Sequence, residues 1–457
     1  CYAQSTGDMV RVQLTLLATV VGGLAWTPVA SQTPSWSPVV RAVPSRQTEQ
    51  ATQRVETAGT PLVANRVPKV FTLSALEALA RVHHPSLAIA AARLTARQSG
   101  RVQAGLYPNP EIAYRGMEMG NLGTPGMQGA MVRQQFITGR KRQLDTRLAD
   151  QEVSEWTARY EAQQQRVRGD VQRQFYATLV AQRYLDLTRE LAQLNGQLAT
   201  ATRQLVEAHQ ETENSLLQAE IQAEESQILW HNAEQRRTAQ WRQLAAGVGL
   251  PQLPVTELSG DLTVDLPDYS WPQAENLVFA HHPWLMAANA RHQRAALAVQ
   301  RAIKEVVPNI DVSVMVQHMY PSNSDTTSLI IGFPIPIWNQ NQGQIAQTRA
   351  ELVAAENDIR RVELELRSRL ADTYGHYANA RQVVQRYRQR ILPRARQSLD
   401  LVRNGFERGQ IDYQTLNQSQ QTFVRTNLAY LDALGRLRDT ASLIESRLMA
   451  SKPDHRD

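Results

Sequence analysis

Residues 307–319 read VPNIDVSVMVQHM, and residues 107–119 carry a related stretch, YPNPEIAYRGMEM. A His-His-Pro motif and a helical run precede each copy, with the motifs at 281–283 and 83–85. A turn-rich loop, a second apolar segment and a very long helical stretch follow each copy. A unit of this size exceeds the roughly 20–50 residues of a solenoid repeat. The sequence therefore predicts a pseudo-symmetric fold with two internal repeats, residues 71–250 and 270–450.

The segments outside the repeats are predicted to be processed or flexible. Residues 1–32 have the features of a signal peptide region: translation starting at Met9, an apolar run and a small-residue cleavage site. The alternative makes Cys1 the lipidated first residue of a mature lipoprotein. Residues 33–70 are predicted to be a flexible linker, 251–269 an inter-repeat linker, and 451–457 a tail. Both interpretations of the N-terminus indicate an exported chain.

The composition favours long helices over a conventional compact core. Of 457 residues, 42% are hydrophobic and only 6% aromatic, and Gln, Ala, Arg and Leu dominate. The single cysteine, Cys1, excludes an internal disulfide framework and a cysteine-based metal site. The net charge of +6 comes from scattered arginines and not from a basic block with interleaved aromatics, so no nucleic-acid partner is expected.

Each repeat is predicted to contain a β-hairpin. The strand-like segments are 111–119 and 130–138 in the first repeat, and 310–317 and 329–338 in the second, where a polar loop at 321–327 joins them. Their lengths are near the roughly 9–11 residues that cross a bilayer at a tilt. Pro334 and Pro336 are expected at a rim or an edge. The alternative is two soluble hairpins packed on a helical domain.

The long helical stretches predict oligomerisation. Residues 139–211 and 343–407 carry a heptad-like pattern, and at 1.5 Å per residue each helix would reach roughly 100 Å. The stretches 139–211 and 343–407 are here called the first and second arms. Each arm turns back into another helix, at 215–246 and 413–450. Pro393 is expected to bend the second arm. A four-stranded sheet with open edges cannot span lipid, so several chains must share one closed barrel. Three chains would supply twelve strands.

The combined motifs resemble those of the TolC-type outer-membrane efflux protein family, and more narrowly its heavy-metal or cation efflux branch (CzcC-like). The resemblance covers about residues 72–448, and the segments that carry it are 108–112, 133–142, 333–345 and 406–413. It implies a mainly α chain with a small β part, in which three copies form a twelve-stranded outer-membrane barrel. A long α-helical coiled-coil barrel would continue it into the periplasm. The implied partners are two further copies of the chain, outer-membrane lipid, a periplasmic adaptor and an inner-membrane pump of the resistance-nodulation-division type.

The candidate site residues lie at the helical turns. The resemblance implies that adaptor docking involves the second turn, with Gly409, Gln410, Ile411, Asp412 and Tyr413, and the first turn, with Glu211, Thr212, Glu213 and Asn214. Gly409 is expected to take a positive φ, and Asp412 to cap the returning helix. Asp412, Thr415 and Gln418 are the pore-aperture candidates. Gly139 and Gly343 are expected to let the chain turn from strand into helix.

Two departures from the family pattern concern these turns. The first turn, residues 206–215, lacks the glycine and is expected to be about three residues shorter than the second, so the two turns would not be equivalent. Where some family members carry carboxylates after the second turn, this chain offers Thr415, Asn417 and Gln418. Asp412 is then the only nearby carboxylate for attracting cations to an aperture.

No catalytic constellation emerges, so neither enzymatic activity nor a cofactor is expected. The histidines of the His-His-Pro motifs are expected to cap helices, with metal ligation as the alternative. Met117, Met119, Met127 and Met131 are expected to face lipid or pack in the loop, with a soft-ligand patch for copper as the alternative.

The predicted function is a passive exit duct for metal cations in a tripartite efflux system. The alternatives are a duct for drugs or secreted proteins, and a periplasmic coiled-coil scaffold without a pore.

Overall fold

The computed structural model describes residues 70–120, 123, 125–264, 266–280, 282–408, 410–446 and 448, and side chains at all of these except Tyr413. All of them lie in one compact unit, Pro68–Asp457. The predicted signal peptide region, the predicted tail and all of the predicted 33–70 linker except Val70 lie outside the described residues. Cys1, the candidate for lipidation, lies outside them as well.

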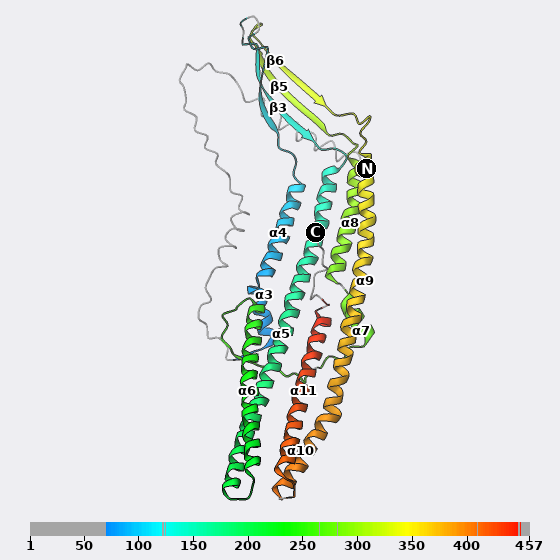
Figure 1. Ribbon diagram of the computed structural model, residues 1–457. Coiled ribbons are helices and arrows are strands. Elements are labelled where there is room, and N and C mark those ends of the chain that lie inside the picture. Colours follow the sequence, from blue (N-terminus) through cyan, green and yellow to red (C-terminus); the bar gives the residue numbers. More distant parts are fainter. Residues whose placement is uncertain are drawn as a thin grey trace, which may run out of the picture. The chain divides into compact units, whose positions relative to one another are not determined.

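The same order of elements occurs twice along the chain (Figure 1). In each half, two helices, two strands and a long helical hairpin follow one another. The first half comprises α3 (Leu73–His83), α4 (Pro85–Ala104), β2 (Glu111–Met117), β3 (Met127–Phe136), α5 (Lys141–Glu207) and α6 (Glu213–Val248). The second half comprises α7 (Trp271–Phe279), α8 (Pro283–Lys304), β5 (Ile310–Met319), β6 (Ser324–Gly332), α9 (Gln342–Arg386), α10 (Leu392–Glu407) and α11 (Tyr413–Glu445). The predicted fold class, mainly α with a small β part, is confirmed.

The four hairpin strands form one antiparallel sheet in the order β2-β3-β5-β6. The two hairpins therefore meet along β3 and β5, whose ten-residue ladder runs from Met127 opposite Met319 to Phe136 opposite Ile310. Within the described residues, β2 and β6 are the edges of this sheet. A second, two-stranded parallel ladder, which the sequence analysis missed, joins β1 (Val70–Phe71) to β4 (Glu257–Leu258).

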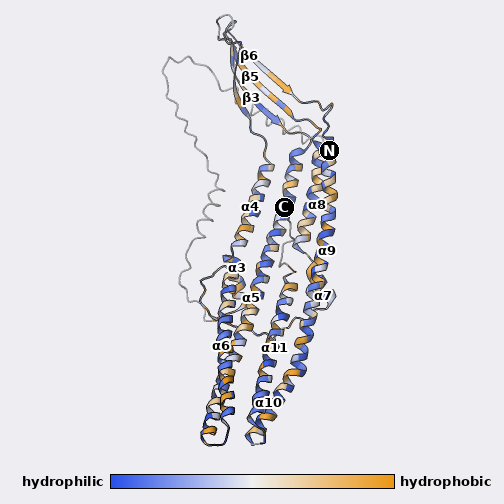
Figure 2. Ribbon diagram, in the orientation of Figure 1, coloured by the Kyte–Doolittle hydropathy of each residue, from blue (hydrophilic) through white to orange (hydrophobic). Residues whose placement is uncertain are grey.

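The core lies among the helices, where α5 packs against α4, α6, α8 and α11. Val171, Phe175 and Leu179 of α5 are at most 2% exposed and belong to one cluster with Trp241 of α6 and Leu434 of α11. Their four-residue spacing places the α5 side chains on one face of the helix, as the heptad-like pattern predicts. Figure 2 shows how hydrophobic and hydrophilic residues alternate along these helices.

The second arm is interrupted, as Pro393 predicts. A π-helical turn, Tyr387–Ile391, separates α9 from α10, and Pro393 lies in the first turn of α10. Proline cannot donate a hydrogen bond to the preceding turn, and its ring displaces the carbonyl that the helix would place there. α5 continues without interruption for 67 residues, so the two arms differ in this respect.

The predicted strand at 329–338 is wrong at both ends. β6 begins at Ser324, inside the predicted polar loop, because the residues from Ser324 to Thr327 pair with β5. It ends at Gly332, before Pro334 and Pro336, which lack the N–H that a ladder requires. The predicted end of the last helix at Ala450 is also too late, since α11 ends at Glu445.

Among the described residues, none of the helices combines the length and the apolar content that a membrane crossing requires.

Candidate functional site

The first helical turn joins α5 to α6 through residues 208–212. The backbone N–H of Gln210 donates to the carbonyl of Leu205 at 2.8 Å, and this bond closes the end of α5. His209 has a φ of +58°, a left-handed conformation in which histidine is more frequent than most residues. Thr212 then caps α6 by accepting from the backbone N–H of Ser215 at 3.2 Å. The turn is thus held at both helix ends.

The second turn joins α10 to α11 through residues 408–412. The N–H of Gln410 donates to the carbonyl of Gly405 at 2.9 Å. Ile411 packs on Gly405, where an added Cβ would lie 2.5 Å from the Ile411 Cδ1 atom. Asp412 caps α11 by accepting from the N–H of Thr415 at 2.7 Å. Gly409 and the side chain of Tyr413 lie outside the described residues.

The expectation that the first turn is about three residues shorter is wrong. Both arms end one residue before the turn, at Glu207 and Glu407, and both returning helices begin one residue after it, at Glu213 and Tyr413. The closing bonds also correspond, because Gln210 and Gln410 each donate to the carbonyl five residues earlier. A glycine is not needed in the first turn, since His209 adopts the left-handed conformation there. Corresponding residues of the two turns, such as Gln210 and Gln410, are separated by the same number of positions throughout. This constant separation is the sequence signal that the two turns have equal length.

Asp412 is the carboxylate of the second turn, which also contains Arg408. Hydrogen bonds from the backbone N–H and side chain of Thr415 lower the pKa of the Asp412 carboxyl, so this exposed group is ionised at neutral pH. Thr415 and Gln418 are exposed on the first turns of α11 and follow Asp412 at three-residue spacing. Such spacing brings the three aperture candidates onto neighbouring positions of one helix face. Figure 1 shows both turns at the same end of the helices, with the sheet at the other end.

The first turn presents its polar residues to solvent. Thr212, Glu213 and Asn214 are exposed, and Glu211 is half-exposed with its Oε2 atom accepting from the N–H of Thr212 at 3.4 Å. Above the turn, Arg203 of α5 bonds to Glu220 of α6 at 2.6 Å. The two helices that bear the turn are therefore linked by an ion pair, although exposed pairs of this kind contribute little to stability.

The two strand-to-helix junctions use different residues. Gly139 has a φ of +65° between β3 and α5, and the next residue, Arg140, has a φ of +58°. The expected turn at Gly343 is wrong, because Gly343 lies inside the first turn of α9, where its φ is not positive. Asn341 takes the left-handed conformation instead, with a φ of +58°. Asparagine tolerates this region better than most residues, so no glycine is required.

The His-His-Pro motifs supply helix caps. His84 caps α4 by accepting from the N–H of Ser86 at 3.3 Å, and His282 caps α8 by accepting from the N–H of Trp284 at 3.1 Å. This confirms the expected role of the second histidine in each motif. His281 lies outside the described residues. Among those described, no three His, Cys, Asp or Glu side chains gather in a group that would hold a metal.

The two faces of the sheet differ in chemistry. The strand register places Ile112, Val132, Val314 and Leu329 side by side on one face, and Ile112 and Leu329 are 77% and 64% exposed. The opposite face carries the charged strand residues Glu111, Arg115, Arg133 and Asp311, with Arg133 and Asp311 paired at 3.3 Å. Because successive strand residues point to opposite faces, the sheet has one polar face and one mainly apolar, exposed face, on which His318 and Asp325 pair at the β5–β6 turn.

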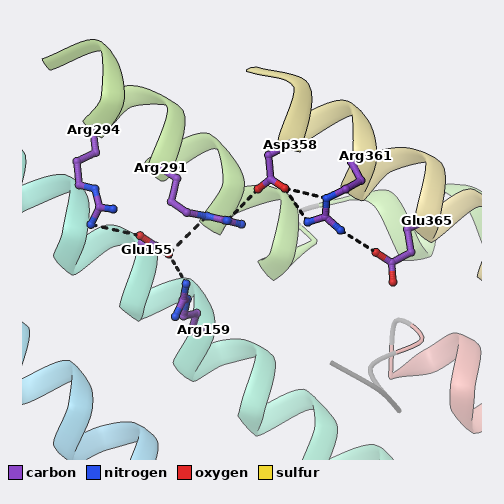
Figure 3. A network of polar contacts seen from close by, with 7 residues as sticks. All are labelled: Glu155, Arg159, Arg291, Arg294, Asp358, Arg361 and Glu365. Atoms are coloured by element: carbon purple, nitrogen blue, oxygen red, sulfur yellow. Dashed lines mark hydrogen bonds and ion pairs between the residues drawn. The ribbon is translucent and has the colours of Figure 1, made fainter. Parts of the chain in front are cut away.

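A network of ion pairs, not found by the sequence analysis, connects the two halves of the chain (Figure 3). Its centre is Glu155 of α5, whose side chain is 4% exposed and contacts Arg159 of the same helix. Arg291 and Arg294 of α8 contact Glu155 at 3.5 and 3.8 Å, and Arg291 also reaches Asp358 of α9 at 2.8 Å. The network thus ties the long helix of the first half to two helices of the second half.

Residues 276–445 match the family described as "Outer membrane efflux protein". Together with the architecture above, this match confirms the resemblance to TolC-type outer-membrane efflux proteins and the predicted outer-membrane location, with the chain extending into the periplasm. By this match and its fold, the chain is similar to outer-membrane efflux channel proteins.

Three known proteins are similar to the chain over most of its length. The chain is 24% identical over 398 residues to the cobalt-zinc-cadmium resistance protein CzcC of Cupriavidus metallidurans, covering 84% of this chain and 91% of that protein. The crystal structure of VceC from Vibrio cholerae is similar with a TM-score of 0.65 and 17% identity, over 82% of this chain and 95% of VceC. Crystal structures of CusC give a TM-score of 0.65 and 15% identity, over 92% of this chain and 99% of CusC.

Proposed function

We propose that the chain is the outer-membrane exit duct of a tripartite efflux system that carries metal cations. Three copies would close their sheets into a twelve-stranded barrel, and their long helices would form a coiled-coil barrel in the periplasm. The halves 71–250 and 270–450 would be two copies of one ancestral unit. The inner-membrane pump would supply the energy, and a periplasmic adaptor would connect the pump to the helical turns.

The observation that carries this proposal is the sheet. Its mainly apolar face is exposed, and its polar face carries most of the charged strand residues. Its edge strands β2 and β6 offer unpaired backbone groups to a neighbouring strand. Lipid offers no hydrogen-bond partners for an open edge, whereas β6 of one copy can pair with β2 of the next. In a closed barrel the apolar face would contact lipid and the polar face would line the passage.

The helical turns support the assignment of the adaptor contact. Both turns expose short polar segments at the end of the helices opposite the sheet, and both are fixed by the same hydrogen bonds. An adaptor that binds one turn would therefore find related backbone geometry in the other. The match of the two turns favours docking by both halves of the chain.

Metal cations are the proposed cargo because the chain is similar over most of its length to CzcC, a protein named for cobalt, zinc and cadmium resistance. A deletion strain should become sensitive to such cations while its drug sensitivity stays unchanged. Sensitivity to drugs alone, or a defect in protein secretion alone, would favour the alternative ducts.

The channel itself is tested in outer-membrane fractions and, for conductance, with the purified chain. We expect heat-modifiable trimers in outer-membrane fractions and conductance in planar bilayers. Monomers or dimers without conductance would favour the periplasmic scaffold and overturn the duct.

Replacing Gly409 with isoleucine tests the docking turn. We expect weaker coupling to the adaptor and reduced efflux, with trimer assembly preserved, because the turn lies away from the sheet. Gly375→Ile is the matched control, since Gly375 lies inside α9 with no atom within 4 Å of an added Cβ. Unchanged efflux in the Gly409 variant would count against the assignment of the turn.

A further inference from the structure

Methionines are concentrated in the two β-hairpins. Six of the nine methionines of the chain lie between residues 117 and 131 or between 315 and 319. The ladder pairs Met117 of β2 directly with Met127 of β3, and Met127 directly with Met319 of β5. Direct partners point to the same face of a sheet, so these three residues, here called the methionine row, lie side by side on the polar face.

The geometry of the row allows its three sulfur atoms to approach one ion. Neighbouring strands are about 4.8 Å apart, and the unbranched methionine side chain has three rotatable bonds that let it adapt. The Sδ atom of Met127 already lies 3.8 Å from the Nε2 atom of Gln317, which precedes Met319 by two residues on β5. The central sulfur therefore points over the same face as Met319. All three side chains are half-buried and remain accessible.

The row is continued by a residue without charge. Ser324 of β6 lies opposite Met319 and completes the cross-strand line. The next line on the same face contains Arg115, Gly129 and Gln317. These two lines therefore combine neutral sulfur ligands with the guanidinium of Arg115, which disfavours divalent cations more strongly than monovalent ones. Glu118 follows Met117 in the turn and lies outside the strand ladder.

Thioether ligands select soft metals, above all Cu(I), whereas Zn²⁺ and Co²⁺ favour imidazole, thiolate or carboxylate. We propose that Met117, Met127 and Met319 form a three-sulfur binding site for a soft monovalent cation, Cu(I) or Ag(I), on the polar face of the sheet. Binding replaces solvent ligands of the ion by thioether sulfur, with no change of oxidation state and no proton released. The site goes beyond the proposed function, because it is a binding equilibrium that exists without transport.

Two other methionines of the hairpins provide contrasts. Met119 lies against Gly116, where an added Cβ would meet its Sδ atom at 3.0 Å. Gly116 belongs to the opposite face, so Met119 is outside the row. Met131 and Met315 are direct partners on the polar face, but the matching position on β2 is Ala113. That line offers two sulfurs where the methionine row offers three.

The test uses the full chain in detergent micelles, with Cu(I) supplied in competition with a chromophoric Cu(I) chelator. We expect one tightly bound Cu(I) per chain, and binding weaker by about tenfold or more in Met127→Leu, because loss of a direct ligand costs at least as much as loss of a supporting residue. Leucine conserves volume, so folding is preserved. Met119→Leu, the matched control, is expected to bind as the unaltered chain does.

Further arms separate the remaining explanations. Met117→Leu and Met319→Leu should weaken Cu(I) binding as Met127→Leu does, which keeps the test valid if one variant misfolds. Excess Zn²⁺ should not displace the bound Cu(I). Absence of bound Cu(I) in the unaltered chain, equal binding by Met127→Leu, or loss of binding only in Met131→Leu would overturn the site. None of these results depends on whether the chain forms a duct.

Discussion

Glu155→Gln removes the charge at the centre of the network between the two halves of the chain. Three guanidinium groups surround the buried carboxylate, with contacts of 2.5 Å to Arg159, 3.5 Å to Arg291 and 3.8 Å to Arg294. At an effective dielectric constant of about 20, each such pair attracts by about 4 kcal/mol before desolvation is subtracted. The substitution leaves the three cations without their common anion while the shape of the side chain is kept.

The net loss is smaller than the gross attraction. Breaking a buried ion pair costs about 3–5 kcal/mol when the partner charge remains. The arginine side chains here are 29% to 42% exposed, so water recovers part of their solvation. We therefore expect the free energy of unfolding to fall by about 2–4 kcal/mol, within the range that buried-pair losses span.

Glu152→Gln is the matched control, one turn earlier on the same helix. Glu152 is 30% exposed and contacts Arg97 at 2.9 Å and the shared Arg294 at 4.0 Å. Exposed pairs of this kind contribute about 0–1 kcal/mol. Denaturant unfolding in detergent, followed by far-ultraviolet circular dichroism, measures both variants. If Glu155→Gln lowers the free energy of unfolding no more than Glu152→Gln does, the network does not stabilise the packing of the two halves.

Two further predictions concern a buried hydroxyl group and a helix cap elsewhere in the helical part of the chain. Tyr377→Phe should lower the free energy of unfolding by about 2–3 kcal/mol, because the buried hydroxyl donates to the Pro267 carbonyl at 2.7 Å and accepts from the Tyr269 N–H at 2.8 Å. Tyr374→Phe loses one longer bond, of 3.3 Å, and should cost less in the same denaturation assay. His84 has its pKa lowered below 6.5 by burial, so protonation favours the unfolded chain. Its stabilisation should be complete above pH 6.5 and lost as the pH falls through the lower, folded-state pKa. His84→Asn, which keeps a capping side chain, should remove that part of the pH dependence, and an unchanged pH profile would contradict the assignment.

The regular elements were predictable because their periodicity is local. The alternation in β5 and the heptad-like spacing of Val171, Phe175 and Leu179 each report one face of one element. Pro393 likewise predicted the interruption of the second arm, because the missing proline N–H removes a hydrogen bond within the same helix. The sequence analysis misjudged the start of β6 because the Ser324 segment becomes a strand only through pairing with β5.

Parts of the site depended on tertiary or backbone information that local patterns lack. Glu155, Arg291 and Asp358 are far apart in the chain, and only the packing of three helices brings them together. The methionine row likewise required the strand register, which adds Met319 and excludes Met119. Asn341 took the conformation predicted for Gly343, because residues other than glycine also adopt a positive φ.

The π-helical turn before Pro393 has a mechanical consequence. An unbroken α-helix resists bending along its whole length, whereas a π-helical turn loosens the hydrogen-bond spacing at one place. We therefore expect α5 to be stiff along its whole length, and the second arm to bend more easily at residues 387–391 than elsewhere. We expect α10 to remain packed against α11 during such bending.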